Sequence, residues 1–292
     1  SGAIGKADRI LDDLFPAQRA FVLDRGHPDT RRIAVRTPGQ AGKSTGVRAR
    51  LMRTCLTIPG AKALYLALSR GSAKEILWSD LKNANQQYDL RASFNNSDLS
   101  MTFSETGREL PSRILLAGAD DQKDIEKYRG IPQDEVCVDE CKSFPAKLLE
   151  ELIDEVLQPR INTRNGQLVL AGTPGKILDG PFYHATRVGS PIARPWVDRE
   201  RPEWLDKAFE WSFHTWTLAD NATTPETAAL WARALAFKAT RGWTDANPAW
   251  RRESLGEWTT DAIGLVYRFD AAKDTWTPGP ATEGNPFGLP PE

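Results

Sequence analysis

Short apolar and β-branched runs alternate with longer mixed stretches over the first two-thirds of this 292-residue chain. The alternation is typical of an α/β fold, in which buried strands are separated by helices. The apolar runs lack the polar alternation of half-exposed strands, which favours a mainly parallel sheet covered by helices on both faces. The expected strands are residues 32–36, 63–68, 113–117, 135–139 and 167–171, and the expected helices are residues 44–54, 72–88 and 146–157.

The pattern changes beyond about residue 190, where prolines and then tryptophans become frequent. Residues 224–238 have the pattern of an amphipathic helix, with Thr224 as its cap and Pro225 in its first turn. The last twenty or so residues are rich in Pro and Gly. We therefore expect a P-loop ATPase core at 1–195, a small helical lid or linker subdomain at 196–270, and a linker or disordered tail at 271–292.

The composition is that of a globular protein, with 26% charged and 40% hydrophobic residues and a formal net charge of −1. This balance argues against a generally basic nucleic-acid-binding surface, but it is compatible with a local basic groove. Cys55, Cys137 and Cys141 show no metal-binding spacing and are expected to be reduced thiols. No apolar run reaches membrane-spanning length and no signal peptide is visible, so we expect no membrane partner. The start Ser1-Gly2 is typical of a cleaved tag and predicts a fragment of a longer chain.

Residues 37–45, Thr-Pro-Gly-Gln-Ala-Gly-Lys-Ser-Thr, have the composition of a phosphate-binding loop between a strand and a helix. Such a loop needs inward N–H groups, a lysine for the β- and γ-phosphates and a hydroxyl for magnesium, which Gly42, Lys43 and Ser44 can supply. The GxxxxGK[ST] pattern expects glycine where this chain has Thr37, and a chance GKST at a helix start is the alternative. The residues expected to contact the nucleotide here are Gly39, Gln40, Ala41, Gly42, Lys43, Ser44 and Thr45.

Two carboxylates follow the apolar run of residues 135–138, about a hundred residues after the loop. A buried strand would bring Asp139 beside the loop to hold Mg2+ together with Ser44, and Glu140 would orient or deprotonate the attacking water. Adjacent carboxylates also occur in surface turns, but the lack of polar alternation before them favours the buried strand. The loop and the acidic pair together predict an ATPase that uses ATP and Mg2+.

Candidates outside these two motifs each have an ordinary alternative. Arg129 precedes the acidic strand and could neutralise charge on a neighbouring subunit's γ-phosphate, or it could be a solvated loop arginine. Arg36 and Arg70 have less support for the same role. Gln18 could read the adenine edge, although glutamine is ordinary at a helix start. Thr173 in Gly-Thr-Pro-Gly could place a hydroxyl near the γ-phosphate or belong to a plain turn.

Seven tryptophans lie between residues 204 and 258. Aromatic side chains can stack on exposed bases, yet such a cluster in a helical region more often forms a core or an interface, so we expect packing. The three histidines, His27, His184 and His214, show no ligand spacing, and we expect no catalytic role for them.

The order of these motifs resembles the ATPase domain of the large terminase subunits of tailed double-stranded DNA phages. The segments that carry the resemblance are FPAQ, GQAGKS, YLALSR, YRG before VCVDE, LAGTPG, and RRESLGEW followed by GLVYRFD. They span residues 10–270, and the incomplete glycine pattern of the loop is similar to that of the family. The resemblance implies a RecA-like P-loop NTPase fold and an ATP-driven motor that translocates double-stranded DNA into a procapsid.

Matching positions imply individual roles in that motor. The implied contacts are adenine for Gln18, phosphates and magnesium for Lys43 and Ser44, metal for Asp139, and water for Glu140. Arg129 matches the arginine that some members offer in trans, and Thr173 lies in the motif that couples hydrolysis to movement. Many members have an arginine where this chain has Gly39, which moves the expected arginine finger to Arg129.

The resemblance also implies partners and a place of action. They are double-stranded DNA, the portal protein, the small terminase subunit and further copies of this chain in a ring, at the procapsid portal in the cytoplasm of the infected host. Relatives continue into a ribonuclease-H-type nuclease domain, which fits the expected truncation after the linker. Two alternatives remain: a helicase-like remodelling ATPase, for which the chain after the sheet is short, and a nucleotide-dependent assembly module with little hydrolysis.

Overall fold

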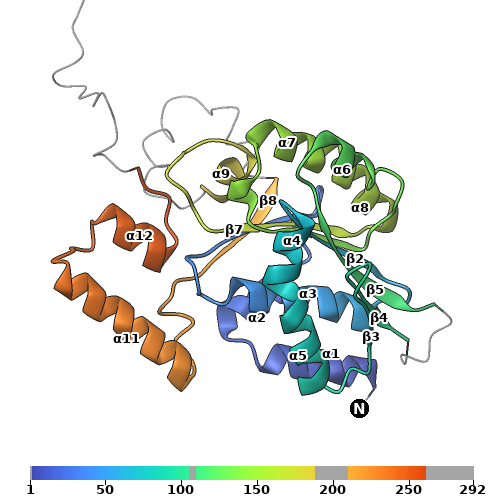
Figure 1. The fold of residues 1–292 in the computed structure, drawn as a ribbon, viewed down its shortest axis with the longest axis horizontal. Helices are drawn as coiled ribbons and strands as arrows, with labels where there is room; N and C mark the ends of the chain where they lie inside the picture. The colour runs from blue at the N-terminus through green and yellow to red at the C-terminus, as the bar shows by residue number, and fades with distance from the viewer. Residues whose placement is uncertain (1, 105–109, 188–209, 261–292) are drawn as a thin grey trace, which may run out of the picture. The chain divides into compact units, whose positions relative to one another are not determined.

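The computed structural model describes residues 2–104, 110–187 and 210–260, and the chain up to Thr259 forms one compact unit. Within these ranges the centre is an eight-stranded sheet in the order β3-β4-β5-β2-β6-β7-β1-β8 (Figure 1). The strands from β5 to β8 pair in parallel, whereas β3, β4 and β5 pair antiparallel at one edge. The strands are β1 (Arg32–Arg36), β2 (Lys62–Ala67), β3 (Ser93–Asn95), β4 (Ser100–Phe103), β5 (Ser112–Gly118), β6 (Glu135–Val138), β7 (Gln167–Gly172) and β8 (Trp211–Thr215).

Helices cover both faces of the sheet, with α1 to α5 on one side and α6 to α9 on the other (Figure 1). Short π-helical turns join α4 to α5 and α7 to α8. The predicted P-loop NTPase architecture, a mainly parallel sheet flanked by helices, is confirmed. The helices are α1 (Ala3–Asp12), α2 (Pro16–Leu23), α3 (Lys43–Thr57), α4 (Arg70–Ala73), α5 (Ser79–Gln87), α6 (Gln122–Glu126), α7 (Ala146–Glu151), α8 (Gln158–Arg164), α9 (Pro181–Thr186), α11 (Pro225–Thr240) and α12 (Pro248–Leu255).

The apolar runs of the sequence become strands because their side chains enter two cores. Every residue of β6 and β7 is buried. Successive side chains of a strand point to opposite faces, so Cys137 joins the core under α1 to α5, whereas Val136 and Val138 join the core under α6 to α9. Burial on both faces leaves no solvent-exposed position for a polar residue, which explains the lack of alternation.

The predicted strands and helices agree with the structure to within a few residues, but some elements were missed. The hairpin β3–β4 and the helix α1 have no counterpart in the sequence-based prediction. The helix predicted at 146–157 continues through a π-turn and α8 to Arg164. None of the helices in the described ranges is long and apolar enough to cross a lipid bilayer.

Strand β8 corrects the expectation that the region after residue 195 is helical throughout. It pairs in parallel with β1 and therefore extends the sheet of the core. Its sequence alternates, so Trp211 and Phe213 pack against the core under α6 to α9, whereas Ser212 and His214 hydrogen-bond Asp24 after α2. This period of two is the signature of a strand, and the density of tryptophans obscured it. The predicted domain boundaries at 195/196 and 270/271 lie outside the described residues.

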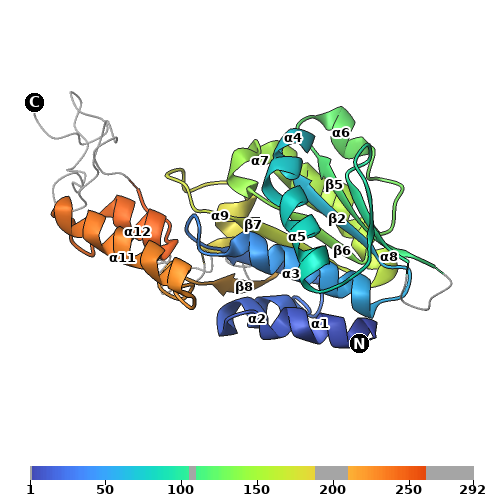
Figure 2. The same ribbon diagram turned by 60° about the horizontal axis from the view of Figure 1, so that its bottom comes forward.

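The helices α11 and α12 lie side by side (Figure 2) and share a contact between Trp231 and Trp250, whose ring centroids are 5.6 Å apart. The helix predicted at 224–238 is confirmed as α11. The hydroxyl of Thr224 accepts from the N–H of Thr227 at 3.3 Å, and Pro225 is its first residue. This capping box satisfies backbone donors that a helix N-terminus otherwise leaves free.

Candidate nucleotide site

The predicted phosphate loop connects the carboxyl end of β1 to the first turn of α3. Two of its residues have a positive φ, Gln40 at 60° and Gly42 at 81°. A Cβ atom on Gly42 would lie 2.6 Å from the Gln18 side-chain nitrogen, so both the backbone angle and the space require glycine there. Thr37, at the position where the general pattern has glycine, is fully buried and its N–H donates to the Gly172 carbonyl at 3.2 Å.

The acidic pair lies directly beside this loop. Asp139 follows the last residue of β6 and is completely buried, and its carboxylate forms an ion pair with the Lys43 ammonium. Glu140 approaches the same ammonium at 3.0 Å through Oε1 and is 37% exposed. The Tyr65 hydroxyl, from the neighbouring strand β2, donates to Asp139 Oδ2 at 2.9 Å. The phosphate lysine and both carboxylates therefore share one site, as the sequence predicts.

Electrostatics inside this site favour a charged Lys43. Burial alone would lower the pKa of Lys43, but the charges of Asp139 and Glu140 outweigh it, so the pKa lies above its usual value. Burial and the Asp139 charge raise the pKa of Tyr65, which keeps its hydroxyl a hydrogen-bond donor.

Glu140 adopts a left-handed backbone conformation, with φ 51° and ψ 41°. Such a conformation is costly for a non-glycine residue and is often found at functional sites. Its N–H donates to Asp139 Oδ1 at 2.7 Å, which turns the two carboxylates of adjacent residues toward the same ammonium.

A cleft of about 400 Å³ opens over the loop and the acidic pair. Among the predicted site residues, Ala41 and Asp139 are fully buried beneath it. The structure adds Pro38, Asn221 and Thr227 to the wall, none of which has a local motif that could have identified it. The cleft is lined by Pro38, Gly39, Gln40, Gly42, Lys43, Ser44, Thr45, Glu140, Thr173, Asn221 and Thr227.

The remaining predicted site residues lie outside the cleft. Gln18 is 3% exposed, and its Nε2 donates to the Gly42 carbonyl at 2.8 Å, so its role in adenine recognition stays a prediction. Arg129 follows α6 and is held by Glu126 at 2.6 Å, Glu151 at 3.7 Å and Glu155 at 3.8 Å. This position does not bring Arg129 to the phosphate loop of its own chain.

The two other candidate arginines also have local partners. Arg36 is buried and donates to the Thr186 carbonyl at 2.9 Å, and burial lowers its pKa to about 10 against the opposing charge of Glu257. Arg70 donates to the Ser97 carbonyl. Neither side chain lines the cleft over the phosphate loop.

The described tryptophans pack, as expected from the sequence. Trp216, Trp250 and Trp258 are each no more than 3% exposed. Trp216 contacts Phe15 and Phe21 at ring-centroid distances of 5.9 and 6.0 Å. Its indole N–H also donates to the Ala41 carbonyl of the phosphate loop at 2.7 Å, a connection that the sequence did not indicate. Trp204 lies outside the described residues.

The end of helix α12 also lies against the loop. Gly256 ends this helix with φ 67°, and a Cβ atom there would lie 2.7 Å from Pro38 Cδ and 2.8 Å from Pro38 N. The segment RRESLGEW, which carries part of the family resemblance, therefore contacts the phosphate loop through its glycine.

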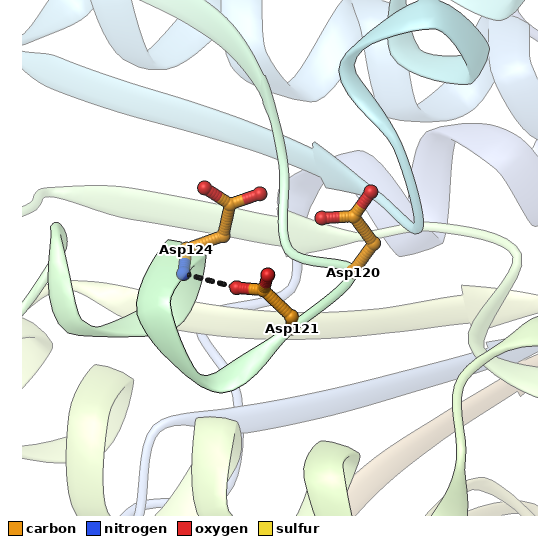
Figure 3. A group of neighbouring side chains, drawn as sticks. All are labelled: Asp120, Asp121 and Asp124. Atoms are coloured by element: carbon orange, nitrogen blue, oxygen red, sulfur yellow. Dashed lines mark hydrogen bonds between the residues drawn. The ribbon is translucent and has the colours of Figure 1, made fainter.

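A separate group of carboxylates, Asp120, Asp121 and Asp124, lies at the start of α6 (Figure 3). Asp121 caps this helix by accepting from the Asp124 N–H at 2.8 Å, and Lys127 forms an ion pair with Asp124. Helix capping and this ion pair account for the arrangement, and we assign it no ligand.

Solved phage large terminases have a fold similar to that of this chain. The Thermus phage P74-26 large terminase ATPase domain aligns with a TM-score of 0.59 and 14% identity, over 86% of this chain and 96% of that one. The large terminase of another thermophilic bacteriophage, solved in complex with ADP, aligns with a TM-score of 0.56 and 15% identity over 84% and 54%. The HK97 bacteriophage large terminase aligns with a TM-score of 0.53 and 14% identity over 86% and 55%.

Sequence comparisons with protein families and with curated proteins gave no match. This chain spans about half the length of the ADP-bound terminase and of the HK97 protein. At these identities the likeness shows the fold, which confirms the predicted resemblance to terminase ATPase domains at that level.

Proposed function

We propose that this chain is the ATPase motor domain of a phage DNA-packaging terminase. It binds ATP in the cleft over the phosphate loop and hydrolyses it to move double-stranded DNA. The observation that carries the proposal is the meeting of Lys43, Asp139 and Glu140 beside a loop with the backbone of an anion site. The similar fold of the large terminase that was solved in complex with ADP supports nucleotide binding in this chain.

The residues present fit ATP and Mg2+. The Ser44 hydroxyl and the Asp139 carboxylate are hard oxygen donors of the kind that Mg2+ prefers, and Ser44 lines the cleft. When bound there, the ion would neutralise charge on the β- and γ-phosphates. In this account the Lys43 ammonium exchanges its carboxylate partners for phosphate oxygens.

Glu140 then orients and deprotonates the attacking water. Its side chain is partly exposed at the cleft and its backbone is fixed by the hydrogen bond to Asp139. Tyr65 is a positioning residue, because it holds the second oxygen of Asp139. General-base catalysis of this kind contributes about 10² to 10⁴ in rate.

Arg129 completes the proposal in trans. Because it lies outside the cleft of its own chain, we propose that it contacts the nucleotide of a neighbouring copy in a ring. Supplying such an arginine accelerates hydrolysis by about 10³ to 10⁵ in other nucleotidases. The proposed partners are double-stranded DNA, the portal protein and the small terminase subunit, at the procapsid portal in the infected host cell.

The position of Arg129 also favours a second candidate function for the isolated chain. A single copy has no arginine at its γ-phosphate apart from those that other copies supply, so the chain could act chiefly as a nucleotide-dependent assembly module. Oligomer size that increases with Mg-ATP while phosphate release stays negligible would support this alternative.

The test is ATP hydrolysis by the wild type and by Lys43→Ala, measured as phosphate release. We expect the wild type to hydrolyse ATP with Mg2+ and Lys43→Ala to lose at least about 100-fold, because the phosphate charge is left unpaired. Equal turnover by both proteins contradicts the proposal. Mixing Arg129→Ala with Glu140→Gln should restore activity at concentrations that allow assembly. Rescue by mixing supports the trans role, and its absence at every concentration contradicts it.

Translocation is tested separately, with a DNA duplex and a strand-separation readout. A packaging motor is expected to hydrolyse ATP faster on double-stranded DNA without separating the strands. Strand separation coupled to hydrolysis would favour the helicase-like alternative.

A further inference from the structure

Three consecutive carbonyl groups of the phosphate loop each accept a hydrogen bond from a different side chain. Asn221 Nδ2 donates to the Gln40 carbonyl at 3.2 Å, and Trp216 Nε1 donates to the Ala41 carbonyl at 2.7 Å. Gln18 Nε2 donates to the Gly42 carbonyl at 2.8 Å. We call Gln18, Trp216 and Asn221 the carbonyl clamp.

The direction of these bonds matters because of the geometry of the peptide group. In a planar trans peptide the carbonyl of one residue and the N–H of the next point in opposite directions. Holding the carbonyls of residues 40, 41 and 42 outward therefore turns the N–H groups of residues 41, 42 and 43 toward the opposite side, which is the cleft. Converging N–H groups are what binds a phosphate.

The clamp is built from three separate parts of the chain. Gln18 lies on α2, Trp216 follows β8, and Asn221 lies in the turn before α11. Their exposed fractions are 3%, 2% and 9%, so water competes little for these bonds. Gln40 also needs support, because its φ of 60° is unfavourable for a residue with a side chain.

We propose that Gln18, Trp216 and Asn221 are positioning residues that hold the phosphate loop in its anion-binding conformation before the nucleotide arrives. Binding then costs less, because the loop does not have to be ordered by the ligand. The inference rests on the proposed nucleotide site and goes beyond it by assigning Trp216 and Asn221 to that site. For Gln18 it gives a role besides the predicted reading of adenine, and an amide has enough donors for both.

The first experiment compares Trp216→Phe with Trp258→Phe. Both tryptophans are 2% exposed, and both lose one indole hydrogen bond, to the Ala41 carbonyl in one case and to Thr186 Oγ1 at 2.9 Å in the other. Isothermal titration calorimetry with ADP and MgCl2 gives the Kd, and thermal unfolding gives the Tm. We expect a similar small fall in Tm for both variants, but a Kd increased about three- to tenfold in Trp216→Phe alone.

A second variant keeps the test valid if Trp216→Phe folds poorly. Asn221→Leu has a similar volume and removes the donor to Gln40, and we expect the same increase in Kd with little change in Tm. An unchanged Kd in both Trp216→Phe and Asn221→Leu overturns the inference, as does an equal increase in Trp258→Phe.

Gln18→Leu separates the two roles of that glutamine. If Gln18 positions the loop, the Kd values for ADP and GDP increase by the same factor, because both nucleotides use the same phosphate contacts. If only ADP weakens, Gln18 reads the base and has no place in the clamp.

The Lys43→Ala variant distinguishes failure of this inference from failure of the proposed function. Without ADP binding by the wild type, or with equal binding by Lys43→Ala, the proposed site itself is wrong. With binding that depends on Lys43 but not on Trp216 or Asn221, the carbonyl clamp alone is wrong.

Discussion

An ion pair joins helix α3 to strand β6 at each end of the strand, and the two pairs differ in their surroundings. At the amino end, Arg50 and Glu135 are 3% and 1% exposed and lie 2.6 Å apart. Arg50 also donates to the Phe21 carbonyl at 2.7 Å. At the carboxyl end, Lys43 meets two carboxylates, Asp139 and the partly exposed Glu140, beside the cleft.

The difference separates a structural pair from a functional one. Around Arg50 each hydrogen-bonding group meets protein, so the pair fixes how α3 lies along β6. Burial raises the pKa of Glu135, and the Arg50 charge opposes this shift and favours the carboxylate. Around Lys43 the cleft leaves room for a phosphate to replace a carboxylate partner. The same two elements are thus locked at one end and open to exchange at the other.

The largest effect on stability is expected from breaking the locked pair. Glu135→Leu leaves the Arg50 guanidinium buried without its anion and should lower the free energy of unfolding by about 3–5 kcal/mol. The double variant Arg50→Met/Glu135→Leu removes both charges and should recover most of that loss. Urea unfolding measures both. A double variant as unstable as the single one would show that the packing, not the charge, causes the loss.

A smaller effect is expected at the loop that carries the open pair. Gly42→Ala adds a methyl group against Gln18 and Asn221 at a residue with φ 81°, and it should cost about 2–4 kcal/mol. Gly242→Ala is the matched control, because Gly242 has φ 62° but no atom within 4 Å of the added Cβ. The control should cost only about 1 kcal/mol. Equal losses in urea unfolding would mean that the Gln18 and Asn221 contacts exert no constraint.

Removing the cation of the open pair should matter less for stability than for binding. Lys43→Met leaves Asp139 with its hydrogen bonds from Tyr65 and from the Glu140 N–H, beside a cleft that admits water. We expect a loss of about 1–2 kcal/mol by urea unfolding, less than half the loss in Glu135→Leu. A loss as large as that in Glu135→Leu would erase the distinction between the two pairs.

The smallest effect concerns Asp24, beside the locked end. Burial alone would raise its pKa, but hydrogen bonds with His214, at 2.7 Å, and Ser212 hold the pKa well below its usual value. A lowered carboxyl pKa stabilises the fold above the unfolded-state value, near 4, and this contribution is lost as the pH falls toward the folded-state value. Asp24→Asn should therefore cost about 1 kcal/mol at pH 7, and the difference from the wild type should shrink below pH 4. A difference independent of pH would contradict the ionic account.

Local sequence predicted the motifs well because their chemistry is contained in a few consecutive residues. The strand before Asp139 and the loop around Lys43 were identified from their composition, and the parallel sheet then required them to meet. The structure confirms this meeting, whereas the catalytic roles stay predictions.

The parts that the sequence did not reveal depend on distant contacts. Asn221 and Trp216 reach the loop from residues far along the chain, and no spacing rule connects them with residues 40 and 41. Arg50 and Glu135 are 85 residues apart and become partners only through the packing of α3 on β6. Strand β8 is different, because its alternation was present in the sequence and was outweighed by the tryptophans around it.

The measurement that tests the central claim most directly is ATP turnover and ATP binding by Glu140→Gln. This variant keeps the shape of the side chain and removes the carboxylate that we propose to act on water. Phosphate release should fall by about 10² to 10⁴, while the Kd for ATP with Mg2+ changes by less than about threefold. Hydrolysis at the wild-type rate would contradict the account that the open end of the α3–β6 contact is the site of ATP hydrolysis.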